Sequence, residues 1–160
     1  MNKICSLSRI LLLLNLFLLF SVVAYASDDV AYFVASDEIF NQITGIRNYL
    51  TNDGVKIVQI KPSELDKLKD IKRFVVFGSP DATDAIGDLI RTSLNETQLN
   101  NARRMGKATF VAASVSGKDA IFFATSFGMT SLVKSSANSW KECFESWYGV
   151  KIPVTQIIGY

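Results

Sequence analysis

Short apolar runs alternate with helical patterns along the first half of this chain. The runs are residues 30–34, 55–60 and 74–77, and each is followed by apolar residues spaced three or four positions apart. The third run has no polar position, which is typical of strands buried on both faces. Because a strand, a helix and the next strand of one sheet form a right-handed parallel unit, the alternation predicts a mostly parallel sheet with helices on both faces.

Capping residues mark the expected starts of the helices. Ser36 precedes an amphipathic helix that ends at the Asn-Asp-Gly sequence of residues 52–54. Ser79 precedes Pro80, and because proline is favoured at the first position of a helix, we expect a helix to begin there. Asn95 is the predicted cap of a further helix over residues 96–105.

The second half of the chain predicts a β-hairpin and then a long helix. Two β-rich runs, residues 109–115 and 120–125, flank a short Ser-Gly-Lys-Asp loop. The helix is expected over residues 130–148, and the strand-like residues 150–158 are interpreted as an edge strand that closes the sheet. The fold class is therefore predicted to be α/β, as a single three-layer domain over residues 27–160 with a mixed, mostly parallel sheet and one late β-hairpin.

The first 26 residues have the pattern of an export signal. Lys3 and Arg9 precede an apolar run, and Ala-Tyr-Ala at residues 24–26 is a small-x-small cleavage site. We therefore expect a signal peptide over residues 1–26 and an exported protein, extracellular or at the cell surface. The alternative is an uncleaved membrane anchor, because the apolar run is close to the minimum length for spanning a bilayer.

Removal of the signal changes how the composition is interpreted. The whole chain has 17 basic and 15 acidic residues, and the signal contains two of the basic ones, Lys3 and Arg9, and no acidic one. The mature chain is therefore formally neutral, which gives no support for nucleic-acid binding. Cys5 leaves with the signal, so no intramolecular disulfide is possible, and we interpret Cys143 as a half-buried structural cysteine.

The chain contains no histidine. This excludes serine–histidine and cysteine–histidine catalysis, histidine general bases and the usual zinc sites. Catalysis by lysine or carboxylate groups stays open. We expect no cofactor, no metal site and no enzymatic activity.

Polar residues follow the predicted strands at the edge of the sheet where ligands bind in open α/β folds. The candidate ligand-binding residues are Ser36, Asp37, Gly78, Ser79, Asp81, Ser126 and Thr130. The turn at Gly78 and Ser79 has the outline of a phosphate cradle, but it lacks the lysine of a P-loop and Asp81 would repel an anion. A tight turn that permits close packing is the simpler interpretation.

Two further patterns concern the surface. Asp81, Asp84 and Asp88 share one face of the expected helix, which suggests either a calcium site or a solvated acidic face, and we favour the solvated face. The sequence Asn-Glu-Thr at residues 95–97 is an N-glycosylation sequon, so Asn95 is a candidate glycosylation site in an exported chain.

One ten-residue segment resembles a strand-turn-helix of archaeal surface-layer (S-layer) and related cell-envelope domains. In those domains an apolar strand is followed by Gly-Gly-Pro-x-Ala. The segment here is Arg-Phe-Val-Val-Phe-Gly-Ser-Pro-Asp-Ala, residues 73–82. The likeness continues more loosely through Leu94, Leu99, the hairpin and residues 124–130. The sequence departs from the pattern at Ser79, which replaces the second glycine, and at residues 126–127. The resemblance implies a non-catalytic module that assembles with envelope components, with no catalytic residues to assign.

Two functions follow from these observations. The first is a non-catalytic, exported interaction domain at the cell surface, which binds envelope or S-layer components or a partner protein. The alternative is an exported small-ligand-binding protein or hydrolase that uses the polar crevice at the strand ends. A concave pocket there would favour the second function, and a flat surface would count against it.

Overall fold

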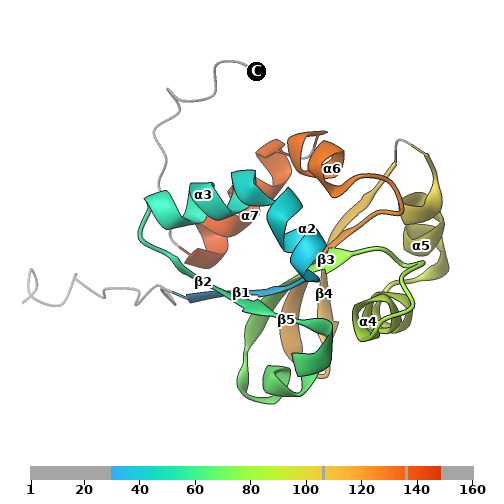
Figure 1. Cartoon of the computed structure of the whole chain (residues 1–160), viewed down its shortest axis with the longest axis horizontal. Helices are drawn as coiled ribbons and strands as arrows, with labels where there is room; N and C mark the ends of the chain where they lie inside the picture. Colours follow the sequence, from blue (N-terminus) through green and yellow to red (C-terminus); the bar gives the residue numbers. More distant parts are fainter. Residues whose placement is uncertain (1–29, 106, 136, 149–160) are drawn as a thin grey trace, which may run out of the picture.

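The computed structural model of the protein describes residues 30–105, 107–135 and 137–148. These residues form one five-stranded sheet between two layers of helices (Figure 1). The strands are β1 (Val30–Val34), β2 (Lys56–Ile60), β3 (Arg73–Gly78), β4 (Thr109–Val115) and β5 (Lys118–Ala124). The helices are α2 (Asp37–Gln42), α3 (Thr44–Asn52), α4 (Ala85–Ser93), α5 (Glu96–Arg103), α6 (Met129–Ser135), α7 (Ala137–Tyr148) and a 3₁₀ helix, η1 (Pro62–Asp70). The expected signal peptide and the expected strand over residues 150–158 lie outside the described residues.

The sheet has the strand order β2-β1-β3-β5-β4. Every neighbouring pair is parallel except β4 and β5, which form an antiparallel hairpin. The hairpin loop is shorter than expected, because Lys118 already pairs with Val115 and only Ser116 and Gly117 turn the chain. Both have positive φ values, 51° and 77°, as the favoured two-residue hairpin turn requires. The predicted fold class is confirmed: a three-layer α/β arrangement with a mixed, mostly parallel sheet and a late hairpin.

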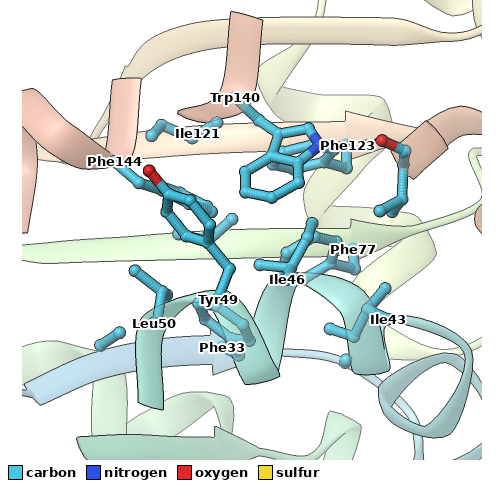
Figure 2. Close-up of a cluster of buried hydrophobic side chains, with 14 of the residues drawn as sticks. Phe33, Ile43, Ile46, Tyr49, Leu50, Phe77, Ile121, Phe123, Trp140 and Phe144 are labelled. Atoms are coloured by element: carbon cyan, nitrogen blue, oxygen red, sulfur yellow. Dashed lines mark hydrogen bonds between the residues drawn. The ribbon is translucent and has the colours of Figure 1, made fainter. Parts of the chain in front are cut away.

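An aromatic cluster connects the central strands to the helices on one face of the sheet (Figure 2). Phe77 of β3 lies between Phe33 of β1 and Phe123 of β5, with ring centroids 5.0 and 4.7 Å away. Phe144 of α7 covers this row, 6.3 Å from Phe33 and 6.2 Å from Phe123. These separations are favourable for aromatic pairs, so the row fixes α7 over three strands. The helices on this face are α2, α3, α6 and α7.

The opposite face is covered by η1, α4 and α5. Its core is aliphatic apart from two phenylalanines, and includes Ile60, Phe74, Val76, Ile86, Ile90, Leu94, Ala102 and Phe122. Helix α4 lies very close to the chain that precedes it. A Cβ atom added to Gly87 would lie 2.1 Å from the carbonyl oxygen of Ala82, a distance that no real Cβ contact has. Only glycine therefore fits at position 87 with this backbone.

Three predicted helices differ from the structure in their boundaries. The helix after β1 divides at Ile43, where φ is −94° and ψ is 26°, into α2 and α3. The helix predicted over residues 96–105 is α5, which ends at Arg103. The helix after β3 begins at Ala85 and not at Pro80, because Asp84 is its N-cap. The Ser79 hydroxyl accepts the amide of Asp81 instead, so residues 79–84 form a loop.

Replacement of Gly87 by alanine is expected to destabilise the fold. The added methyl group would collide with the main chain of Ala82, so α4 would have to move away from its loop. We expect Gly87→Ala to lower the free energy of unfolding by about 3 kcal/mol in urea denaturation.

Gly45 provides the matched control for this change. It is an exposed glycine near the start of α3, and a Cβ atom there would have nothing within 4 Å. Gly45→Ala should therefore raise stability by about 0.5 kcal/mol, since alanine favours the helix. Equal effects at the two positions would contradict the close approach of α4.

Candidate functional site

A crevice opens where the chain leaves β1 and β3 in opposite directions. These strands are neighbours, but β1 continues into α2 on one face of the sheet and β3 leads to α4 on the other. Such a divergence leaves space beyond the carboxyl ends of the strands. A cavity of about 330 Å³ lies at this point. Its polar lining consists of Ser36, Glu38, Ser79 and Asp84, and its apolar lining includes Ile39, Phe77, Ala82 and Ile86.

The crevice combines buried apolar side chains with acidic groups. Phe77 and Ile86 are almost fully buried and form its apolar base. Glu38 is exposed and Asp84 is half-buried, so both carboxylates are open to solvent. None of the residues that line the crevice is basic. The site therefore favours a neutral or positively charged ligand over an anion.

The α2 side of the crevice is formed by a helix cap. The Ser36 hydroxyl accepts the amide of Ile39 at 3.3 Å, as predicted for an N-cap. Asp37 does not line the crevice. Its carboxylate accepts hydrogen bonds from Lys61 Nζ at 2.8 Å and from Gln59 Nε2 at 3.0 Å, so it holds the ends of β1 and β2 together. The hydrogen bond from Lys61 is the main cause that lowers the pKa of Asp37.

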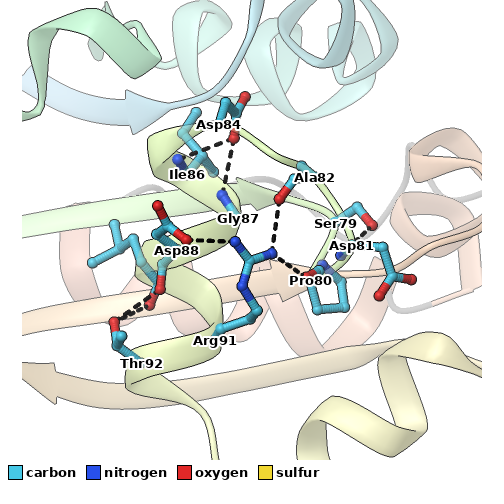
Figure 3. Close-up of polar contacts among 11 residues, drawn as sticks. Ser79, Pro80, Asp81, Ala82, Asp84, Ile86, Gly87, Asp88, Arg91 and Thr92 are labelled. Carbon is cyan, nitrogen blue, oxygen red and sulfur yellow. Dashed lines mark hydrogen bonds and ion pairs between the residues drawn. The ribbon is translucent and has the colours of Figure 1, made fainter.

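The opposite side of the crevice is a loop that Arg91 of α4 holds in place (Figure 3). Its guanidinium Nη1 donates to the carbonyl oxygens of Pro80 at 2.6 Å and Ala82 at 2.7 Å. Its Nη2 is paired with Asp88. The Asp84 carboxylate accepts the amide of Gly87 at 2.9 Å, which joins the end of the loop to the helix. We call this set of contacts the Arg91 clamp.

A second set of hydrogen bonds connects the loops that follow β3 and β5. The Ser79 hydroxyl donates to Ser126 Oγ at 3.4 Å, and the Ser126 hydroxyl donates to the Asp81 carboxylate. Arg103 of α5 donates from Nε to the same carboxylate at 2.8 Å. The structure thus brings three candidate residues together, and we call them with Arg103 the serine–aspartate network. Thr130 lies elsewhere, where its hydroxyl donates to the carbonyl oxygen of Gln42 at 3.5 Å.

The serine–aspartate network is suited to holding loops. The hydrogen bond from Ser126 lowers the pKa of Asp81, and the bond from Arg103 adds to the effect. Asp81 is therefore ionised at neutral pH and is a poor proton acceptor for a neighbouring serine. The Ser79 and Ser126 hydroxyls and the Asp81 carboxylate thus connect the loops that follow β3 and β5.

The acidic residues expected on one helix face have separate partners. Asp81 belongs to the serine–aspartate network, Asp84 caps α4, and Asp88 pairs with Arg91. The expectation of one shared acidic face is therefore wrong, because Asp81 and Asp84 precede the helix. Among the described residues, no group of three or more aspartate, glutamate or cysteine side chains is placed to hold a metal ion.

Two surface expectations agree with the structure. Cys143 is half-buried, and burial raises the pKa of its thiol. Asn95 is exposed and caps α5: its Oδ1 accepts the amide of Gln98 at 2.9 Å, and the Gln98 side chain accepts the amide of Asn95. Glycosylation of Asn95 stays a prediction.

Sequence reasoning missed several residues that shape the site. Glu38 and Asp84 line the crevice, and Arg91 and Arg103 hold its loops. The available signals were weak: Asp84 lies two residues before Ile86 at a spacing that suits an N-cap, and Asp88 and Arg91 are three apart on a helix. No signal in the sequence links Arg103 to Asp81.

Comparisons with known proteins add no relative. No family model, curated protein or solved structure matches the chain. Within the part of the chain that the structure describes, no helix is long and apolar enough to cross a membrane.

The serine–aspartate network predicts a pH-dependent contribution to stability. The pKa of Asp81 is lower in the folded protein than its ordinary value of 3.8, so its contribution is present above that pH and is lost as the pH falls through the folded-state pKa. Asp81→Asn should lower the urea midpoint at pH 7. The difference from the wild type should shrink as the pH is lowered from 7 to below 3.8.

Asp66→Asn is the control for this experiment. Asp66 is exposed on η1 and forms no ion pair among the described residues. Its replacement should leave the urea midpoint nearly unchanged both at pH 7 and at the acidic pH. A difference between Asp81→Asn and the wild type that is the same at both pH values would show that the charge of Asp81 does not matter.

Proposed function

We propose that this protein is an exported, non-catalytic binding domain that holds a small neutral or cationic organic molecule in the crevice between β1 and β3. The observation that carries this proposal is the cavity of about 330 Å³ at the strand ends, with its apolar base and two carboxylates. Binding sites for small molecules are concave, mostly apolar and equipped with a few polar groups, and their volumes begin at about 300 Å³. Export is inferred from residues 1–26.

The charges around the crevice indicate which ligands fit. An anion would meet Glu38 and Asp84, and the amides of Ile86 and Gly87 at the start of α4 are already bonded to Asp84. A phosphate group would therefore find like charges, and two of the amides at this helix end are already bonded. A protonated amine on a short apolar body is the complementary ligand, because its ammonium group faces the carboxylates while its body contacts Phe77 and Ile86.

The hydroxyl groups of the crevice support binding without catalysis. Ser36 and Ser79 each accept a main-chain amide, from Ile39 and Asp81 respectively, and so hold the turns that border the crevice. Neither is bonded to a lysine or to a carboxylate among the described residues. This arrangement supports a binding protein over the hydrolase considered from the sequence.

A second function, association with the cell envelope, uses a different part of the molecule. It follows from the resemblance to surface-layer domains and from two exposed apolar side chains, Met105 and Phe127. Retention of the native protein in an envelope fraction is the result expected from this function. Recovery of all the protein in the soluble fraction would contradict it.

The binding proposal is tested with three probes that share one apolar body. The chain from Ser27 onward is titrated with 2-phenylethylamine, 2-phenylethanol and 3-phenylpropionate, and amide shifts are followed by NMR. Shifts are expected at residues 36–39 and 77–86, largest for the amine and smallest for the carboxylate, because the crevice is acidic. Absence of shifts in both segments for all three probes would overturn the proposal.

Isosteric variants test the role of charge. Glu38→Gln keeps an oxygen for the hydrogen bond from Gln42, and Asp84→Asn keeps the N-cap of α4. The double variant should bind 2-phenylethylamine about tenfold more weakly, which corresponds to about 1.4 kcal/mol, and 2-phenylethanol as before. Asp66→Asn removes a charge away from the crevice and should change neither affinity. Equal weakening for the amine and the alcohol would contradict recognition by charge.

A further inference from the structure

Two exposed apolar side chains lie on neighbouring segments of the chain. Met105, after α5, is 83% exposed, and Phe127, between β5 and α6, is 41% exposed. Among the described residues these are the most exposed large hydrophobic side chains. Main-chain contacts hold the two segments together, since the Ser126 amide donates to the carbonyl oxygen of Ala102 at 2.8 Å. The Thr125 hydroxyl also donates to the carbonyl oxygen of Lys107 at 3.3 Å. Figure 1 shows both segments at the same end of the molecule.

The surroundings of these side chains are positively charged. Arg104 and Lys107 are exposed, and neither forms an ion pair among the described residues. The sequence contains no acidic residue over 97–118 or over 120–141. Asp81 lies in this region, but its negative charge is already paired with Arg103. We call Arg104, Met105, Lys107 and Phe127 the basic apolar edge.

The composition of the basic apolar edge indicates its partner. Unpaired cations complement a negatively charged surface, and exposed apolar side chains complement a surface that they can enter. Two apolar side chains are too few for a stable protein interface, which buries about 800 Å² on each partner. Shallow insertion into a lipid headgroup layer needs no such area, because electrostatic attraction to anionic lipids adds to the burial of apolar side chains.

We propose that the basic apolar edge binds the surface of a membrane that contains anionic phospholipids. Met105 and Phe127 enter the headgroup layer, and Arg104 and Lys107 contact the phosphate groups. This contact is peripheral and does not involve residues 1–26. It also uses residues other than those that line the crevice.

Co-sedimentation with vesicles tests the proposal on the chain from Ser27 onward, so that an uncleaved signal cannot bind lipid. The vesicles are phosphatidylcholine alone or an equal mixture with phosphatidylglycerol. We expect the protein to bind the mixture and to bind phosphatidylcholine much more weakly. Binding to the mixture should fall as salt is added. Equal binding to both vesicles, or to neither, would overturn the proposal.

Two double variants separate the contributions of charge and insertion. Arg104→Gln with Lys107→Gln should lower the partition coefficient at least tenfold, because each basic residue near an anionic surface contributes about 1 kcal/mol. Met105→Ser with Phe127→Ser should lower it as well and leave the net charge unchanged. All four side chains are exposed, so near-wild-type thermal unfolding is expected for both variants.

A matched control removes the same charge elsewhere. Lys67→Gln with Lys69→Gln changes two exposed lysines of η1, and its binding to the mixed vesicles should equal that of the wild type. Loss of binding in this control, equal to that of the Arg104 and Lys107 variant, would show that net charge alone acts. Full binding by the Met105 and Phe127 variant, together with competition by heparin, would identify a general polyanion site and overturn membrane insertion.

Discussion

The position of α4 depends on two glycines at points where the helix meets other parts of the chain. A Cβ atom on Gly78 would lie 2.9 Å from Ile86 Cγ2, and one on Gly87 would lie 2.1 Å from the carbonyl oxygen of Ala82. The end of β3, the loop of residues 79–84 and the first turns of α4 are therefore packed as one unit. The crevice exists because this unit lies on one face of the sheet while α2 leaves β1 on the other.

Local patterns were sufficient to predict the strands and the fold class. Apolar runs identified β1, β2 and β3, and the sequence around Gly117 identified the hairpin. The strand order and the neighbouring positions of β1 and β3 depend on long-range pairing, which has no local signal. The crevice was therefore expected at the strand ends in general, and its location between these two strands came from the structure.

The start of α4 shows why a correct local rule gave a wrong boundary. Ser79 followed by Pro80 suits a helix start, and so does Asp84, whose carboxylate accepts the amides of Ile86 and Gly87. In the structure the helix begins at the second site, and Arg91 of the helix holds the intervening loop by bonds to the carbonyl oxygens of residues 80 and 82. A contact that depends on the folded loop cannot be recognised from residue spacing. The same holds for Arg103 and Asp81, which are separated by 22 positions.

The two proposed binding regions are linked by the loop after β5. The Ser126 side chain is hydrogen-bonded to Ser79, which lines the crevice, and to Asp81. The Ser126 amide donates to the carbonyl oxygen of Ala102 in α5, the helix that precedes Met105. The hydrogen bonds that order one region thus also order the other. Under the two proposals, one domain combines recognition of a small molecule with attachment to a membrane surface.

Within the Arg91 clamp, the hydrogen bonds from Arg91 to the loop are made to main-chain oxygens and not to side chains. Its bonds to residues 80 and 82 are made by carbonyl groups that every amino acid has. These bonds do not depend on which side chains stand at positions 80 and 82. The side chain at position 82 is limited instead by α4, because the Ala82 Cβ atom would lie 3.1 Å from a Cβ atom at position 87. A small residue at one of these two positions is thus tied to the absence of a side chain at the other.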